Sequence, residues 1–109
     1  MNFGEAIEAL KLGRRVSRKG WNDKGMFIFM RPACEVTAET ASLFESLPWS
    51  VKNWMCATVR QDNKLTFTPY LCMKAADGTI VNGWLASQTD MLSEDWCDLD
   101  DTEEAHCPG

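Results

Sequence analysis

Residues 76–92 read ADGTIVNGWLASQTDML, and this stretch decides the fold. Asp77 and Gly78 separate the strand-like run LCMK from the run TIV, so they predict a β-hairpin. A tight type I′ turn, with positive φ at both central residues, is the expected connection. The hairpin in turn predicts an antiparallel sheet at the centre of the fold.

The second half of the stretch predicts one wall of a ligand pocket. Trp84 follows the second strand, and Ser87 offers a hydroxyl that caps the N-terminus of a short helix. Asp90, three residues further on, suits the positive end of that helix. A helix start beside an indole favours a flat, phosphorylated ligand.

The remaining chain predicts one α+β ligand-binding domain over residues 1–99. With 109 residues and 45% hydrophobic side chains, the chain has enough apolar surface for one core. An N-terminal helix over about residues 3–12, capped by Asn2, is expected to pack on a small antiparallel sheet by its apolar stripe. Residues 26–30 predict the central strand, and residues 95–99 predict the last one.

The middle of the chain, residues 32–64, predicts a variable, helical excursion from the sheet. Thr37 or Thr40 is the expected cap of its first helix. Trp49 and Trp54 are expected either in a core or in a contact between subunits, because large aromatic side chains are usually buried.

Two short strands are expected near the end of this excursion. Residues 57–60 and residues 65–68 have strand-like composition, and residues 61–64 between them contain Asp and Asn, which favour a tight turn. The two strands are therefore expected to pair with each other.

Charge is separated along the chain. Residues 1–31 hold seven Lys and Arg against three acids, whereas residues 77–109 hold nine acids and no base. The two parts are expected to attract one another within or between subunits. A net charge of −5 without a basic stripe argues against a nucleic acid polymer as partner. The acidic residues 100–109 are expected to form a disordered tail.

Enzymatic chemistry finds little support in the sequence. Five cysteines form no CxxC pair, so unpaired thiols and no metal site are expected. His106 lies in the tail, which leaves a nucleophile without a histidine base. The acids Asp90, Glu94 and Asp95 are interpreted as caps and solvated charges. The sequence thus predicts no catalytic residue and no cofactor, and the lack of a long apolar run predicts a cytoplasmic protein without membrane contact.

Ligand binding is better supported. Trp21 and Trp84 lie among small and polar neighbours, where an indole is hard to assign to a core, and stacking on a nucleobase contributes roughly 1–3 kcal/mol. The alternative is that each indole pins a loop to the sheet. The candidate ligand-binding residues are Trp21, Asn22, Trp84, Ser87 and Asp90, with Arg18, Lys24 and Gln88 as weaker candidates.

Several motifs together resemble a family of small phage and prophage proteins, Thoeris anti-defence protein two. The motifs are MNFGEA at 1–6, RKGWN at 18–22, ADGT at 76–79, WLASQTDML at 84–92 and EDW at 94–96. The resemblance covers residues 1–31 and 65–99, whereas residues 32–64 depart from the compact pattern of the family.

The resemblance implies a non-enzymatic sponge that sequesters a cyclic ADP-ribose isomer, gcADPR, made by TIR-domain defence proteins of the Thoeris system in the bacterial host. It implies a homotetramer with its pockets between subunits, and pocket residues at Trp21, Asn22, Trp84, Ser87 and Asp90. The altered middle segment leaves two alternatives open. One is a sponge for cyclic dinucleotides or oligonucleotides of a CBASS-type system, and the other is a protein-interaction inhibitor of a defence enzyme.

Overall fold

A computed structural model describes residues 1–58 and 64–101 of the chain. The chain divides into two compact units. The sheet unit comprises residues 1–31 and the described residues from 70 onward, and the insert unit comprises the described residues of 32–69. The elements of the sheet unit are α1 (Phe3–Lys11), β1 (Val16–Arg18), the 3-10 helix η1 (Asn22–Lys24), β2 (Phe27–Arg31), β5 (Tyr70–Lys74), β6 (Ile80–Asn82), α4 (Gln88–Leu92) and β7 (Trp96–Asp98).

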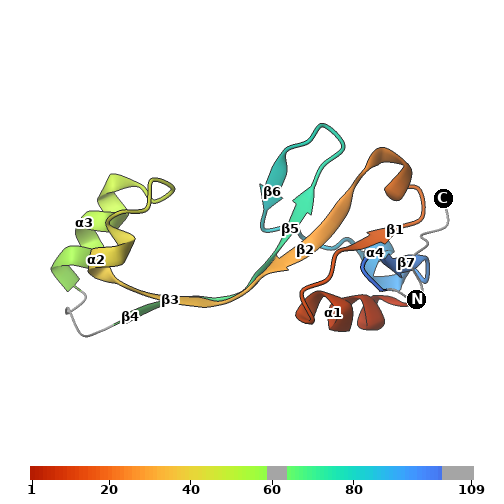
Figure 1. The fold of residues 1–109 in the computed structure, drawn as a ribbon, viewed down its shortest axis with the longest axis horizontal. Coiled ribbons are helices and arrows are strands. Elements are labelled where there is room, and N and C mark those ends of the chain that lie inside the picture. The colour runs from red at the N-terminus through yellow and green to blue at the C-terminus, as the bar shows by residue number, and fades with distance from the viewer. Residues whose placement is uncertain (59–63, 102–109) are drawn as a thin grey trace. The chain divides into compact units, whose positions relative to one another are not determined.

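The sheet unit confirms the predicted α+β fold. Its five strands lie in the order β6-β5-β2-β1-β7, and every neighbouring pair is antiparallel (Figure 1). Helix α1 packs on β1, β2 and β7. The core is formed where this helix meets the sheet, by Ala6, Ala9, Leu10, Val16, Ile28 and Trp96.

Local sequence explains both ends of α1. The Asn2 Oδ1 atom accepts a hydrogen bond from the Glu5 backbone N–H at 2.9 Å, and the Glu5 carboxylate accepts one from the Asn2 N–H at 3.0 Å. This capping box satisfies two N–H groups that a helix start leaves free. Gly13 follows the C-cap with φ of 84°, a left-handed conformation that glycine adopts without steric cost.

The β5–β6 hairpin is present, but the prediction of a type I′ turn is wrong. No described residue other than glycine has positive φ, so Asp77 does not take the conformation that this turn requires. Gly78 alone is left-handed, with φ of 95°. The Asp77 carboxylate accepts hydrogen bonds from the Thr79 N–H at 3.0 Å and from the Thr79 hydroxyl at 2.7 Å. These bonds stabilise a longer loop, in which Asp77 acts through its side chain.

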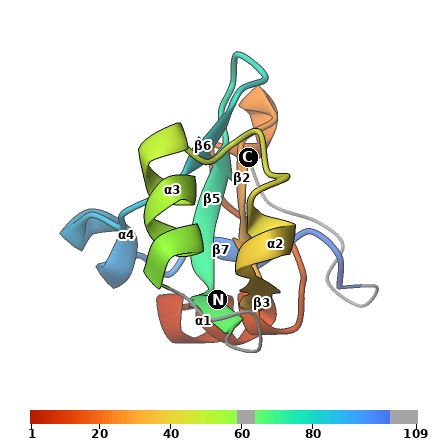
Figure 2. The same cartoon turned by 90° about the vertical axis from the view of Figure 1, so that its left-hand side faces the viewer.

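The insert unit contains β3 (Cys34–Thr37), α2 (Ala38–Ala41), α3 (Trp49–Thr58) and β4 (Lys64–Phe67). Strand β4 pairs with β3 (Figure 1). Helix α2 lies beside α3 (Figure 2). Thr37 is the observed cap of α2, because its hydroxyl accepts from the Thr40 N–H at 3.1 Å. The small core of this unit consists of Ala38, Ala41 and Met55.

Two predictions for this region are wrong. Residues 57 and 58 belong to α3 and not to a strand, while the rest of the predicted strand, with most of its turn, lies outside the described residues. The strand partner of β4 comes from before the helices, which the local sequence does not reveal. Trp49 and Trp54 were expected either in a core or in a contact between subunits, and their exposed fractions of 75% and 54% exclude the core. The contact between subunits stays a prediction.

The separated charges meet within the chain. Arg14 contacts Asp98 at 3.0 Å, and Arg15 holds Asp100 through its Nε and Nη2 atoms, the latter at 2.7 Å. Hydrogen bonding to Asp100 raises the pKa of Arg15, and the same contact lowers the pKa of Asp100. Asp100 is thus held at the start of the acidic tail, and residues 102–109 lie outside the part that the structure describes.

The cysteines follow the expectation only in part. Cys34, Cys56 and Cys72 are free thiols. Cys97 is disulfide-bonded, so the prediction of unpaired thiols is wrong at this position.

Candidate functional site

Three indoles gather at one place in the sheet unit. Trp21 immediately precedes η1, Trp84 follows β6, and Trp96 is the first residue of β7. The Trp21 ring lies 6.1 Å from the Trp84 ring and 5.3 Å from the Trp96 ring, both edge to face. Trp84 and Trp96 are 6.2 Å apart in a similar arrangement. We call these three residues the tryptophan cluster.

The members of the tryptophan cluster differ in burial. Trp96 is 2% exposed and belongs to the core, whereas Trp21 and Trp84 are half-buried and pack against that core. The expectation that each indole pins a loop is thus confirmed, and the expectation of a ligand contact stays a prediction. Trp21 and Trp84 fix loops to the sheet unit, and each keeps part of its surface open to solvent.

Arg18 lies against the tryptophan cluster from β1. Its Cζ atom is 5.8 Å from the centre of the Trp21 ring and 5.9 Å from the centre of the Trp96 ring. Strand pairing explains the second contact, because Arg18 is opposite Trp96 in the β1–β7 register. A guanidinium at this distance from an aromatic ring is attracted by the ring quadrupole.

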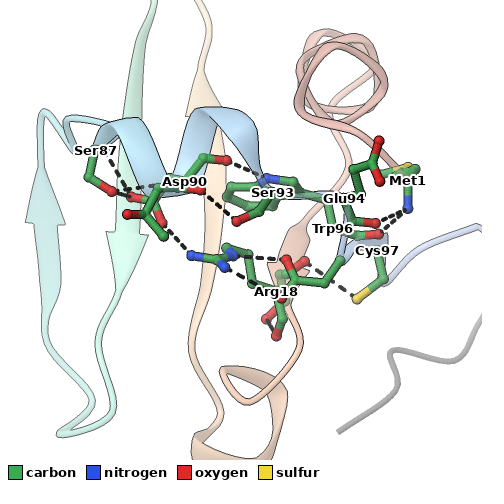
Figure 3. Close-up of polar contacts among 11 residues, drawn as sticks. Met1, Arg18, Ser87, Asp90, Ser93, Glu94, Trp96 and Cys97 are labelled. Atoms are coloured by element: carbon green, nitrogen blue, oxygen red, sulfur yellow. Dashed lines mark hydrogen bonds and ion pairs between the residues drawn. The ribbon is translucent and has the colours of Figure 1, made fainter.

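Two carboxylates hold the Arg18 guanidinium. Its Nη1 atom donates to Asp90 Oδ1 at 2.8 Å, while Nε and Nη2 donate to the two Asp95 oxygens at 2.9 Å and 3.4 Å (Figure 3). The Arg18 side chain is 17% exposed, and the Asp90 side chain is 13% exposed. Screening by water is therefore weaker here than for a surface ion pair. The hydrogen bonds, with Asp95 first and Asp90 next, raise the pKa of Arg18 against the opposing effect of its burial.

Asp90 also caps α4. The Ser87 hydroxyl accepts from the Asp90 N–H at 3.0 Å, and Asp90 Oδ2 accepts from the Ser87 N–H at 2.9 Å and from its hydroxyl at 2.8 Å. This confirms Ser87 as the N-cap and adds a full capping box. Burial alone would raise the pKa of Asp90, but hydrogen bonds from Ser87 and Arg18 outweigh it and lower that pKa.

The backbone of Asp90 joins the cap to the indoles. The indole Nε1 of Trp96 donates to the Asp90 carbonyl oxygen at 2.9 Å (Figure 3). Helix α4 is thereby attached to β7, and the buried indole N–H has its hydrogen-bond partner. The cap, the ion pairs and the indoles form one connected network.

The structure brings together five of the eight predicted site residues. These are Arg18, Trp21, Trp84, Ser87 and Asp90.

The other three are Asn22, Lys24 and Gln88, whose side chains are exposed. Within residues 1–58 and 64–101, their side chains form no hydrogen bond or ion pair with this network. They stand beside it on η1 and α4, where they remain open to solvent.

Sequence reasoning missed Asp95 and Trp96 as members of the site. Both fall in a segment predicted as the closing strand, and local pattern alone gave no reason to connect that strand with Arg18. The signal is the antiparallel pairing of β1 with β7, which depends on strand order in the sheet.

A hollow of about 500 Å³ lies elsewhere in the sheet unit, beside α1 and the end of β7. Its lining consists of Met1, Glu5, Glu8, Ala9, Leu12, Arg14, Asp98 and Asp101. Four of these eight side chains are carboxylates, which disfavour a phosphorylated ligand. The network around the tryptophan cluster is therefore the better candidate for the predicted ligand.

Fold and network together define a class of protein. It is a small α+β domain in which a helix packs on an antiparallel sheet and a cluster of tryptophans lies beside an arginine–aspartate ion pair. The chain belongs to the Thoeris anti-defense 2-like domain family, whose model matches residues 1–99. Thoeris anti-defense 2 of Bacillus phage SP01 is 35% identical over 96 residues, which cover 88% of this chain and 91% of that protein. The family match includes residues 32–64, so the insert lies within the similarity and not outside it.

Proposed function

We propose that this protein is a non-enzymatic anti-Thoeris sponge, which binds gcADPR and withholds it from the defence effector of the infected bacterium. The observation that carries the proposal is the pair of half-buried indoles, Trp21 and Trp84, fixed 6.1 Å apart beside the Arg18–Asp90 ion pair. The name of the phage relative, Thoeris anti-defense 2, supports the biological setting.

The indoles suit the purine of such a ligand. Each already packs on the core by one part of its surface, so little conformational entropy remains to be lost on binding. An aromatic ring stacked on a base contributes roughly 1–3 kcal/mol. Trp21 and Trp84 thus supply a preorganised wall for a base.

The diphosphate of gcADPR requires cations that are not already paired within the chain. Arg14, Arg15 and Arg18 are engaged by carboxylates of the same chain. Lys19 and Lys24 flank Trp21 in sequence, and both are exposed. They are the proposed phosphate contacts, with Asn22 and Gln88 as partners for ribose hydroxyls.

The state of Asp90 disfavours a chemical attack on the ligand. One oxygen of its carboxylate accepts from Arg18 and the other from Ser87. A carboxylate with a lowered pKa is a weak base, and it is poorly suited to donate a proton near neutral pH. Sequestration needs tight binding and slow release, which buried contact area supplies without a reactive group.

We propose further that the protein is a homotetramer and that a second subunit completes each site. The sheet unit exposes several large apolar side chains near β6 and α4: Ile80, Val81, Leu85, Met91 and Leu92. Strand β6 is at the edge of the sheet, where its outer backbone groups are open to pairing. Covering this surface would enclose a ligand that one subunit leaves open.

None of the helices within residues 1–58 and 64–101 has the length and the apolar composition of a membrane span. We place the site of action in the cytoplasm of the bacterial host, where the nucleotide signal is made.

The proposal is tested by ligand depletion. Purified protein is incubated with gcADPR, the free nucleotide is removed by filtration, and the bound fraction is released by heat and identified by mass spectrometry. Recovery of intact gcADPR is expected. Recovery of a hydrolysed product would indicate an enzyme and would overturn the sponge.

A matched pair of variants assigns the site. Trp84→Ala is expected to weaken gcADPR binding by about 5- to 150-fold, which corresponds to the loss of one stacked base. Trp49→Ala removes an exposed indole of the insert unit and is expected to leave the affinity unchanged. Calorimetry gives both affinities, and size-exclusion chromatography confirms that the oligomer persists. Equal loss in both variants would contradict the assignment to the sheet unit.

The same calorimetry distinguishes the ligand class. A panel of cyclic dinucleotides beside gcADPR tests the CBASS-type alternative. Tighter binding of a dinucleotide would replace gcADPR as the ligand while keeping the tryptophan wall.

A further inference from the structure

Within the network, the Asp95 side chain contacts Arg18 and has no second structural role of the kind that Asp90 and Trp96 have. Asp90 caps α4 and Trp96 fills the core, whereas the Asp95 carboxylate has Arg18 as its side-chain partner. The contact is a fork, with Nε on one carboxylate oxygen and Nη2 on the other. A fork fixes the plane of the guanidinium as well as its position.

The plane of Arg18 matters because two indoles lie against it. The guanidinium carbon is within 6 Å of both the Trp21 and the Trp96 ring centres, at 5.8 Å and 5.9 Å. Trp21 in turn meets Trp84 edge to face. A rotation of the guanidinium would therefore alter the support of the indole that is proposed to face the ligand.

The contacts of Arg18 also compensate its charge. Arg18 carries one positive charge, and Asp90 with Asp95 carries two negative charges, so the group has a net charge of −1. All five N–H donors of a guanidinium lie in one plane, and the two carboxylates engage three of its nitrogens. Arg18 thereby supports the rings, and its charge is already compensated within the chain.

We propose that Asp95 is a positioning residue of the tryptophan site, which holds Arg18 in the plane that supports Trp21. The inference rests on the proposed ligand-binding function for its effect on affinity. Its effect on the indoles themselves needs no ligand and is measured separately.

The chain provides a matched control. Arg15 is held by Asp100 in a similar fork, and its guanidinium lies 5.3 Å from the centre of the Phe27 ring. Asp95→Asn and Asp100→Asn therefore remove the same charge from the same kind of contact. Only the first of the two contacts involves tryptophan.

The first measurement uses ligand-free protein. Near-UV circular dichroism reports side chains in fixed packing, and the edge-to-face indoles of the tryptophan cluster dominate that signal because Trp49 and Trp54 are exposed. Asp95→Asn and Arg18→Lys are each expected to reduce the tryptophan band. Asp100→Asn is expected to leave it as in the wild type.

The double variant separates positioning from general stabilisation. If Asp95 acts through Arg18, combining Asp95→Asn with Arg18→Lys changes the band no further than Arg18→Lys alone. Additive changes would overturn the proposal, and so would a wild-type band in Asp95→Asn. Should Asp95→Asn fail to fold, Asp95→Glu serves in its place, because it keeps the charge and displaces the fork by one methylene.

The second measurement is the affinity for gcADPR by calorimetry. Asp95→Asn is expected to weaken binding roughly tenfold, the size expected when a partly buried cation–π support is lost. Asp100→Asn is expected to bind as the wild type does. Wild-type affinity in Asp95→Asn would overturn the proposal. If the wild type itself does not bind gcADPR, the proposed function fails, and the dichroism alone decides the role of Asp95.

Discussion

At the scale of single residues, Asp90 shows how many structural contacts one residue can make. It closes the capping box of α4 with Ser87, pairs with Arg18, and gives its backbone carbonyl to the indole of Trp96. Replacing it by alanine would disturb all of these at once. Loss of ligand binding in such a variant would therefore not identify Asp90 as a ligand contact, and Trp84 is the better residue to test.

The lowered pKa of Asp90 predicts how stability changes in acid. A carboxyl whose pKa is lower in the folded chain stabilises the fold above its ordinary value of 3.8, and the contribution is lost as the pH falls through the lowered pKa. Asp90→Asn is expected to lower the free energy of unfolding by about 1–2 kcal/mol near neutral pH. The variant should then lose less stability than the wild type on acidification.

Urea unfolding at neutral pH and at about pH 3 measures this difference. Asp23→Asn is the control, because Asp23 is exposed and forms no ion pair within the described ranges. An equal loss on acidification in Asp90→Asn and the wild type would contradict the prediction.

At the scale of elements, α4 depends on its cap more than a long helix does. It has five residues, too few for its own hydrogen bonds to repay helix nucleation. Ser87→Ala is expected to cost about 1 kcal/mol and to increase hydrogen exchange of the amides in residues 88–92. Ser46→Ala, in an exposed loop of the insert unit, is expected to change neither quantity. Unchanged exchange in Ser87→Ala would show that tertiary contacts, and not the cap, hold α4.

The elements also show which kinds of structure the sequence predicts. The caps at Asn2 and Ser87 and the strands beside Asp77 and Gly78 were predictable, because the interacting residues are close in sequence. The same holds for the end of α1 at Gly13.

Long-range pairing was not predictable. β4 pairs with β3 across two helices, and the local composition of residues 57–60 gave a strand where α3 continues through residue 58. Asp95 was missed as a site residue for the same reason, since its partner Arg18 is brought near only by the pairing of β1 with β7. The turn type failed differently, because the Asp77 side chain bonds to Thr79 in a longer loop, in which Gly78 has positive φ and Asp77 does not.

At the scale of the whole molecule, the insert unit leaves the sheet unit from one place. Arg31 at the end of β2 and Tyr70 at the start of β5 are direct partners in the antiparallel ladder. Two residues suffice to connect such partners in a hairpin. Replacing residues 32–69 by Asn-Gly is therefore expected to preserve the sheet unit.

Tryptophan spectra test this replacement. The shortened chain keeps Trp21, Trp84 and Trp96, so its emission should shift to shorter wavelength as the exposed Trp49 and Trp54 are lost. The near-UV dichroism of the tryptophan cluster should remain. A chain without that signal would show that the sheet unit needs the insert in order to fold.

The pairing of β1 with β7 has a consequence for how the protein is made. Ribosomes synthesise Arg14, Arg15 and Arg18 early, whereas their carboxylate partners and Trp96 follow some eighty residues later. Val16 and Asp98, for example, are direct neighbours in the sheet. The third indole and the Asp95 fork are thus the last parts of the network to leave the ribosome. A nascent chain carries its basic segment uncompensated, and the proposed site is assembled only after Asp95 and Trp96 have left the ribosome.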